Sequence, residues 1–127
     1  MPSDEDYERL LAFRIRLRRF DQWSRQAAAD VGLTHAQHQL LLAIRGHRGE
    51  QGPSIRDVAE ALLVKQHTAS ELVDRTQVLG LVNRIRDESD HRRVHLRLTR
   101  KGQDVIDRLT AVHLEELRRL APVLGRL

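Results

Sequence analysis

Basic side chains are concentrated in one short part of the sequence, residues 84–101. This stretch contains seven arginines and lysines and only three acidic residues, so it alone has a local excess of four positive charges. Such an excess is typical of a surface that binds a polyanion, and nucleic acid is the first candidate. Charge alone leaves open the alternative of an ordinary solvated strand face.

The order of residues within this stretch predicts a β-hairpin with a basic turn. Residues 93–98 alternate basic and apolar side chains, as in a strand with one buried face, and 81–86 form the preceding strand. In the seven-residue connection, Arg92 can enter a narrow minor groove, where the potential of DNA is most negative. Asp90 can orient this arginine or bind the backbone amides of the turn. We expect flanking phosphates to be contacted by the arginines on the strands, namely Arg84, Arg86, Arg93 and Arg97.

A short amphipathic helix is predicted immediately before the hairpin, from Gln66 to Leu79, and Gly80 stops it. Its apolar positions, Ala69, Leu72, Val73, Thr76 and Leu79, are predicted to face the core. The exposed residues that suit base edges in a major groove are Gln66, His67 and Ser70, and those that suit phosphates are Lys65 and Arg75. Taken alone, this helix is better explained as an ordinary surface helix, since Glu71 and Asp74 are acidic. Its position before a basic hairpin reverses that preference and favours DNA binding.

Helical periodicity predicts the elements that position these residues. A long helix is expected from Asp4 to about Asp30, ending at Gly32. Capping signals at Thr34, Ser54 and Thr99 begin three further helices, and we expect Pro122 to kink or interrupt the last one. The predicted fold class is mainly α with a small β-hairpin wing. It is a winged helix-turn-helix (34–100) between long N-terminal (1–33) and C-terminal (101–127) helices, in one continuous domain.

The long first helix has more apolar surface than its partner helices within one chain need, and all four aromatic residues lie on it. A dimer interface is therefore a serious alternative to ordinary core packing for this helix. The family resemblance described next implies a homodimer built from the first and last helices. The residues predicted to form it are Leu10, Phe13, Leu17, Phe20, Leu109, Leu117, Leu120 and Leu124.

The stretch from residue 33 to residue 102 resembles the MarR-type winged-helix transcription regulators. The matching motifs are Leu-Thr-x-x-Gln at 33–37, Val58-Ala59, Leu72-Val73-Asp74-Arg75, Gly80-Leu81-Val82, Asp90-x-Arg92 and Leu98-Thr99-x-x-Gly102. The resemblance implies a homodimer that binds a pseudo-palindromic operator, acts as a repressor and is released by a small anionic or aromatic ligand. It also implies that Arg92 is the minor-groove arginine, that Asp90 supports it and that residues 66–71 contact bases. Because the chain has no cysteine, family members that respond to thiol oxidation are not a model for it.

Other functions are weighed against this interpretation. A metal-responsive regulator would use His35, His38, His113 and Glu116, but no further spacing completes a tetrahedral site. The preferred interpretation makes His35 and His38 exposed and His113 an interface residue. A winged-helix module that binds only proteins stays open. An enzyme is not expected, since the sequence contains no catalytic motif or phosphate-binding glycine loop, and no cofactor is expected.

Two further expectations concern ligand and location. Any effector pocket should lie where the long helices meet the second helix, near Phe20, Trp23 and Leu41. The acidic first residues are unlike a secretory signal, no apolar run has the length of a membrane span, and cysteine is absent. We therefore expect a cytoplasmic protein that does not bind membranes.

Overall fold

The computed structural model describes residues 1–124, with side chains described through residue 122. It is mainly helical and contains one two-stranded antiparallel hairpin, so the predicted fold class is confirmed. In chain order the elements are α1 (Asp4–Asp30), α2 (His35–Arg45), α3 (Ile55–Leu62), α4 (Gln66–Val78), β1 (Val82–Arg86), β2 (Val94–Leu98) and α5 (Arg100–Leu124).

Local sequence signals explain where the helices begin and end. Capping boxes begin α1, α2 and α3, in which the side chains of Ser3, Thr34 and Ser54 each accept a hydrogen bond from the backbone amide three residues later. Gly32 after α1 and Gly80 after α4 have positive φ values of 81° and 76°, a conformation that glycine adopts without strain. Helices α1 and α4 therefore end within one residue of the positions that the sequence predicts.

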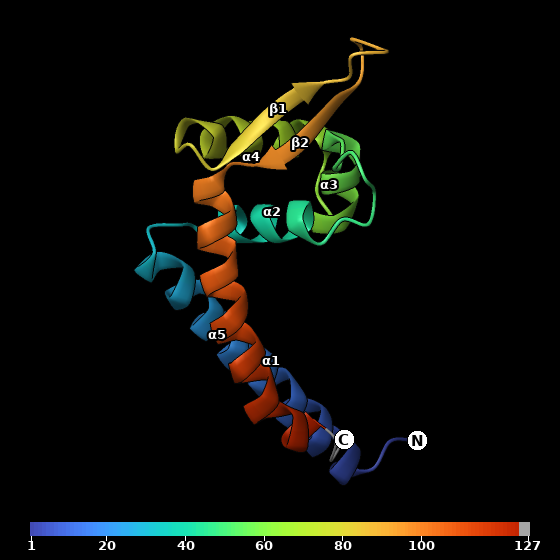
Figure 1. The fold of residues 1–127 in the computed structure, drawn as a ribbon. Helices are drawn as coiled ribbons and strands as arrows, with labels where there is room; N and C mark the ends of the chain where they lie inside the picture. The colour runs from blue at the N-terminus through green and yellow to red at the C-terminus, as the bar shows by residue number, and fades with distance from the viewer. Residues whose placement is uncertain (125–127) are drawn as a thin grey trace.

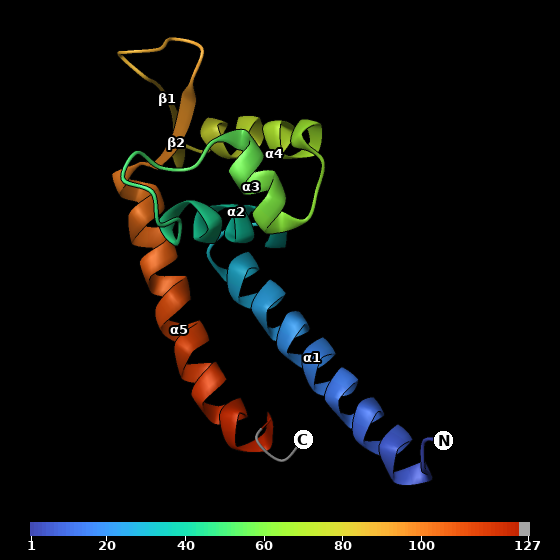
Figure 2. The ribbon, with the colours of Figure 1, turned by 90° about the vertical axis from the view of Figure 1, so that its right-hand side faces the viewer.

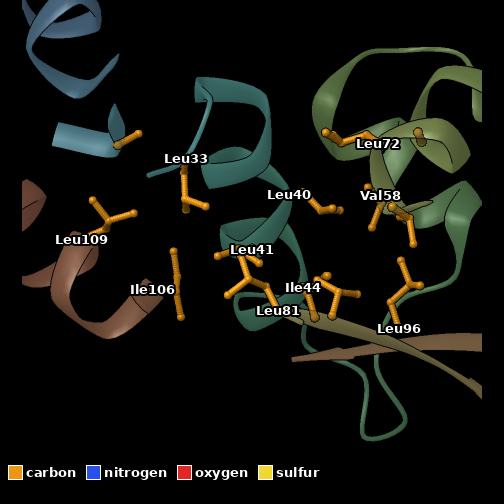
Figure 3. Packing of buried hydrophobic residues seen from close by; sticks show 14 of the residues in the cluster. Leu33, Leu40, Leu41, Ile44, Val58, Leu72, Leu81, Leu96, Ile106 and Leu109 are labelled. Atoms are coloured by element: carbon orange, nitrogen blue, oxygen red, sulfur yellow. The ribbon is translucent and has the colours of Figure 1, made fainter. Parts of the chain in front are cut away.

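Helix α2 is the centre of the hydrophobic core. It contacts α1, α3, α4, α5 and β2, and its residues Leu40 and Leu41 are completely buried. Figure 3 shows these leucines between Leu109 of α5 on one side and Val58 of α3 on the other. A core shared in this way joins the helix-turn-helix and the long helices into one packing unit.

The Leu98-Thr99-x-x-Gly102 motif fixes the hairpin to both of its neighbouring helices. The hydroxyl of Thr99 donates to the carbonyl oxygen of Gly80 (2.6 Å) and accepts from the backbone amide of Gly102 (3.0 Å). The backbone amide of Thr99 donates to the carbonyl oxygen of Leu81 at 3.0 Å. A side chain at position 102 would overlap that same carbonyl oxygen, so only glycine fits there. The motif is thus a structural junction.

The two long helices extend from the core toward the chain termini, whereas α4 and the hairpin lie at the opposite end of the molecule (Figures 1 and 2). The first twelve residues are all exposed in the single chain. Helix α5 continues through Pro122 to Leu124, so the expected interruption does not occur. Proline has no N–H, so it removes one backbone hydrogen bond of α5 at this position. In the part of the chain that the structure describes, no helix is long and apolar enough to cross a membrane.

Candidate nucleic-acid interface

Helix α4 has a buried face and an exposed face, as its sequence predicts. Ala69, Leu72, Val73 and Thr76 are buried, and the exposed side includes Gln66 and His67. Leu79, predicted to be in the core, is 40% exposed because the helix has ended by this residue. The backbone of α4 begins after Lys65 without a side-chain cap, unlike α1, α2 and α3. Its first backbone N–H groups therefore remain available to an anion such as a phosphate.

The polar residues of α4 do not all face the same way. His67 and Arg75 point outward, and both are paired with Glu71, at 3.0 Å from Nε2 of His67 and 3.7 Å from a guanidinium nitrogen of Arg75. Ser70 is only half exposed and lies against the hairpin, where its carbonyl oxygen accepts from Arg84 at 3.3 Å. Among the candidate base-contacting residues, Gln66 and His67 thus have the freer positions.

The tip of the hairpin is held in place by Asp90. One carboxylate oxygen of Asp90 accepts from the backbone amide of Arg92 (3.1 Å) and from its Nε (3.2 Å). The backbone amide of Arg93 donates to the carbonyl oxygen of Asp90, and its side chain is 3.9 Å from the carboxylate. The carboxylate therefore both fixes the turn and orients Arg92, whose side chain is nevertheless 92% exposed. An arginine that is oriented and solvent-exposed is well placed to enter a groove.

A second carboxylate, Asp87, organises the start of the same turn. Its oxygen Oδ1 accepts from the backbone amide of Ser89 (3.0 Å) and from the Ser89 hydroxyl (2.8 Å). These hydrogen bonds to the charged form lower the pKa of Asp87, the backbone bond having the larger effect. Asp87 therefore stays ionised at neutral pH, and the turn has a defined shape without DNA.

The basic residues on the strands fall into two environments. Arg86, Arg93 and Arg97 are exposed, and Arg86 also donates to the carbonyl oxygen of His91 at 3.3 Å. Arg84 instead turns back onto α4 and is mostly buried. The prediction that His95 lies on an exposed face is wrong, since both of its ring nitrogens are buried and have no hydrogen-bond partner.

A family model described as "MarR family" matches residues 31–93, about half of the chain, which run from the start of α2 to the hairpin tip. The chain belongs to the MarR family. The matched region contains the helix-turn-helix and Asp90-x-Arg92, whereas the long terminal helices lie outside it.

Relatives of this MarR-family chain include two curated regulators. It is 29% identical to the HTH-type transcriptional regulator TtmR of Methylorubrum extorquens (strain PA1), over 80% of this chain and 51% of TtmR. It is 27% identical to the HTH-type transcriptional regulator PecS of Dickeya dadantii (strain 3937), over 68% of this chain and 52% of PecS. The chain thus spans about half the length of the curated relatives it matches.

Solved structures show the same fold. A MarR-family protein from Bacillus stearothermophilus superposes with a TM-score of 0.80 at 23% identity, covering 94% of this chain and 81% of that one. A mutant of Staphylococcus aureus MepR bound to an oligodeoxyribonucleotide gives a TM-score of 0.73 at 25% identity, covering 91% of this chain and 82% of that one.

A cavity of about 360 Å³ lies where α1, α2 and α5 meet, in the region expected for an effector pocket. Phe20, His38 and His113 line it. Trp23 was also expected near this pocket; it does not line the cavity, although its ring lies 4.8 Å from that of His113. The prediction that Leu41 lies at this pocket is wrong: Leu41 is completely buried in the core, and the neighbouring Leu42 lines the cavity instead.

The histidines that the sequence offers as metal ligands are only partly brought together. The rings of His38 and His113 are 4.6 Å apart, whereas Glu116 pairs with Arg119. Among the described residues, no three potential ligands are close enough to hold a metal ion. His38 was expected to be exposed, but it is 2% exposed because it shares the inward face of α2 with Leu41.

The buried His38 at this junction is neutral at pH 7. Burial, and to a smaller extent the nearby His113 and His35, lowers the pKa of His38 to about 4. Nδ1 of His113 donates to the carbonyl oxygen of Leu109 at 2.6 Å, since that oxygen can only accept. Nε2 is hydrogen-bonded to the hydroxyl of Ser24 at 2.7 Å, a contact between α1 and α5 that sequence patterns do not reveal.

The predicted dimerisation residues occupy three kinds of position. Exposed apolar side chains include Leu10, Leu17 and Leu117, whereas Phe13, Phe20 and Leu120 are half-buried. Leu109 is buried in the core of its own chain, so it is not available to a partner, and its prediction as an interface residue is wrong. The side chain of Leu124 lies outside the described residues.

Proposed function

We propose that this protein is a transcription regulator that binds duplex DNA in a sequence-dependent manner. The observation that carries the proposal is the arrangement at one end of the molecule: the exposed side of α4 and the basic hairpin tip lie on the same end, away from the chain termini (Figure 2). A helix of this kind fits a major groove, and Arg92 at the hairpin tip fits the adjacent minor groove. Phosphates are available to Lys65, Arg75, Arg86 and Arg93.

The functional unit that we propose is a homodimer. Apolar side chains stand exposed along both long helices, among them Leu10, Leu17 and Leu117. A second copy of the chain is the simplest partner that would bury a stripe on both helices, because a two-fold axis presents the same surface twice. A two-fold protein calls for a pseudo-palindromic operator with half-sites about one helical turn, or a multiple of it, apart.

We further propose that DNA binding represses transcription and that a small ligand relieves it. The cavity at the junction of α1, α2 and α5 supports release by a ligand. It lies between the long helices proposed to form the dimer and α2, and α2 packs against α4. A ligand that bound only one arrangement of these helices would shift the distance between the two copies of α4.

The decisive experiment is selection of binding sites from random duplexes with the purified protein, followed by gel shifts on the recovered sequence. We expect an enriched motif with two-fold symmetry. The affinity should fall steeply with salt, by about 0.9 log units per phosphate contact for each tenfold rise in salt concentration. Sedimentation of the complex should give two chains per duplex. Selection that enriches no sequence, with no binding at low salt, would contradict the proposal and leave the protein-binding module as the better explanation.

A further inference from the structure

Arg84 is set apart from the other described arginines of the hairpin by its contacts with α4. It pairs with Leu96 across the hairpin and alternates with the exposed Asn83 and Ile85, so it lies on the face that packs toward the core. Arg86 shares this face but lies at the strand end beside the turn, where it is exposed. The side chain of Arg84 is 28% exposed and points at α4.

The guanidinium of Arg84 contacts three successive turns of α4. Its Nη1 donates to Oε1 of Gln77 at 2.7 Å, and its Nη2 lies 2.7 Å from Oδ1 of Asp74. Nη2 also faces the carbonyl oxygen of Ser70 at 3.3 Å. Residues 70, 74 and 77 form one stripe along the helix, since side chains three and four residues apart lie on the same face. The planar fork of arginine can satisfy several acceptors of this stripe at once.

We propose that Arg84 is a positioning residue that sets the orientation of α4 relative to the hairpin and does not itself bind a phosphate. The inference rests on the proposed function and changes the role that the sequence suggests for this residue. Two features support it: the charge of Arg84 is already balanced by Asp74, and both of its terminal nitrogens already have partners within the chain. Because α4 and the hairpin would enter neighbouring grooves, their relative orientation determines whether both can bind at the same time.

Salt dependence separates positioning from phosphate binding. The variants are Arg84→Gln and Arg84→Lys, with Arg86→Gln as the matched control from the same strand, and the probe is the duplex recovered by site selection. We expect Arg84→Gln to weaken binding roughly tenfold with an unchanged slope of log K against log salt. Arg86→Gln should lower that slope by about 0.9 per protomer. Arg84→Lys, which keeps the charge and loses the fork, should bind as weakly as Arg84→Gln.

Asp74, the acidic partner of Arg84, gives a second test, because positioning and simple electrostatics predict opposite changes in DNA affinity when it is substituted. Asp74→Asn removes a negative charge from the side of α4, and electrostatics alone would make DNA binding tighter. Positioning by Arg84 makes it weaker, since the ion pair is lost. Tighter binding of Asp74→Asn, a reduced salt slope for Arg84→Gln, or wild-type affinity of Arg84→Lys would each overturn the proposal.

Hydrogen exchange on the free protein tests the same contact without DNA. We expect backbone amides in the second half of α4 to exchange faster in Arg84→Gln than in Arg86→Gln, while those of α2 exchange alike in both. Equal protection of α4 in the two variants would overturn the positioning role. A wild-type protein that binds no duplex but shows this difference in exchange would refute the proposed function and leave the contact with α4 intact.

Discussion

Folding stability should fall as the pH is lowered from neutral, and His38 should account for a large share of the loss. This residue is 2% exposed, and its ring lies 4.6 Å from that of His113. A positive charge there would lose its hydration and lie beside a second histidine, which is why the pKa of His38 is lowered to about 4. The native state therefore holds His38 neutral.

The size and sign of the effect follow from proton linkage. A folded-state pKa below the unfolded value means that the unfolded chain binds the extra proton, so the contribution is fully present above about pH 6.5 and is lost as the pH falls toward 4. The difference between about 6.5 and about 4 corresponds to about 3.4 kcal/mol at full protonation. About 2 kcal/mol of this should already be lost at about pH 5.

Urea unfolding of the wild type and of His38→Gln, at one fixed protein concentration, measures this contribution. The amide of glutamine does not titrate, so the wild type should lose about 2 kcal/mol more than the variant between about pH 7.5 and pH 5. His91→Gln is the matched control, because this histidine is exposed on the hairpin, and it should follow the wild type. Parallel curves for the wild type and His38→Gln would show that the buried ring does not resist protonation.

Three further changes test the interface, the hairpin junction and the dimer. Arg92→Ala should weaken operator binding about tenfold in gel shifts and leave the thermal midpoint unchanged, since the side chain is exposed; unchanged binding would remove the hairpin tip from recognition. Gly102→Ala should cost roughly 2 kcal/mol in urea unfolding, more than Gly80→Ala, where a side chain meets nothing and only positive φ is strained; equal costs would contradict the close approach. Leu10→Glu should shift sedimentation toward the monomer, because Leu10 is exposed on α1. A dimer undisturbed by the glutamate would exclude this part of α1 from the interface. Leu109→Ala should instead lose roughly 3 kcal/mol of stability, because Leu109 is buried in its own chain.

Local features of the fold could be predicted from the sequence because their causes are local. The capping pairs that begin α2 and α3 involve residues three apart, and the glycines after α1 and α4 have the left-handed conformation expected of them. The hairpin follows from alternation over five residues in each strand. In each case the interaction partners are close in the chain, so the residue types already determine the geometry.

Contacts between distant segments were predicted less well. His38 and His113 are 75 residues apart and belong to helices whose relative rotation no local pattern specifies. The burial of Leu109 likewise depends on how α5 lies across α2. Periodicity identifies the apolar side of a helix, but it does not say whether that side meets the same chain or a second copy.

The arginines of the hairpin show that some of this information was present in the pattern and was outweighed by charge. Arg84 is two residues after Val82, and strand alternation places both on the buried face, whereas Arg86 lies at the strand end beside the turn. Grouping arginines by charge predicts the same phosphate contacts for both residues. Arg84 and Arg86 share a strand face, and their positions along the strand separate them: Arg84 contacts α4, whereas Arg86 contacts the turn at His91. Strand face separates Arg84 from Arg97, which pairs with the exposed Asn83. For a basic hairpin beside a helix, strand face and distance from the turn are together a better guide than charge to which arginines are free to meet a phosphate.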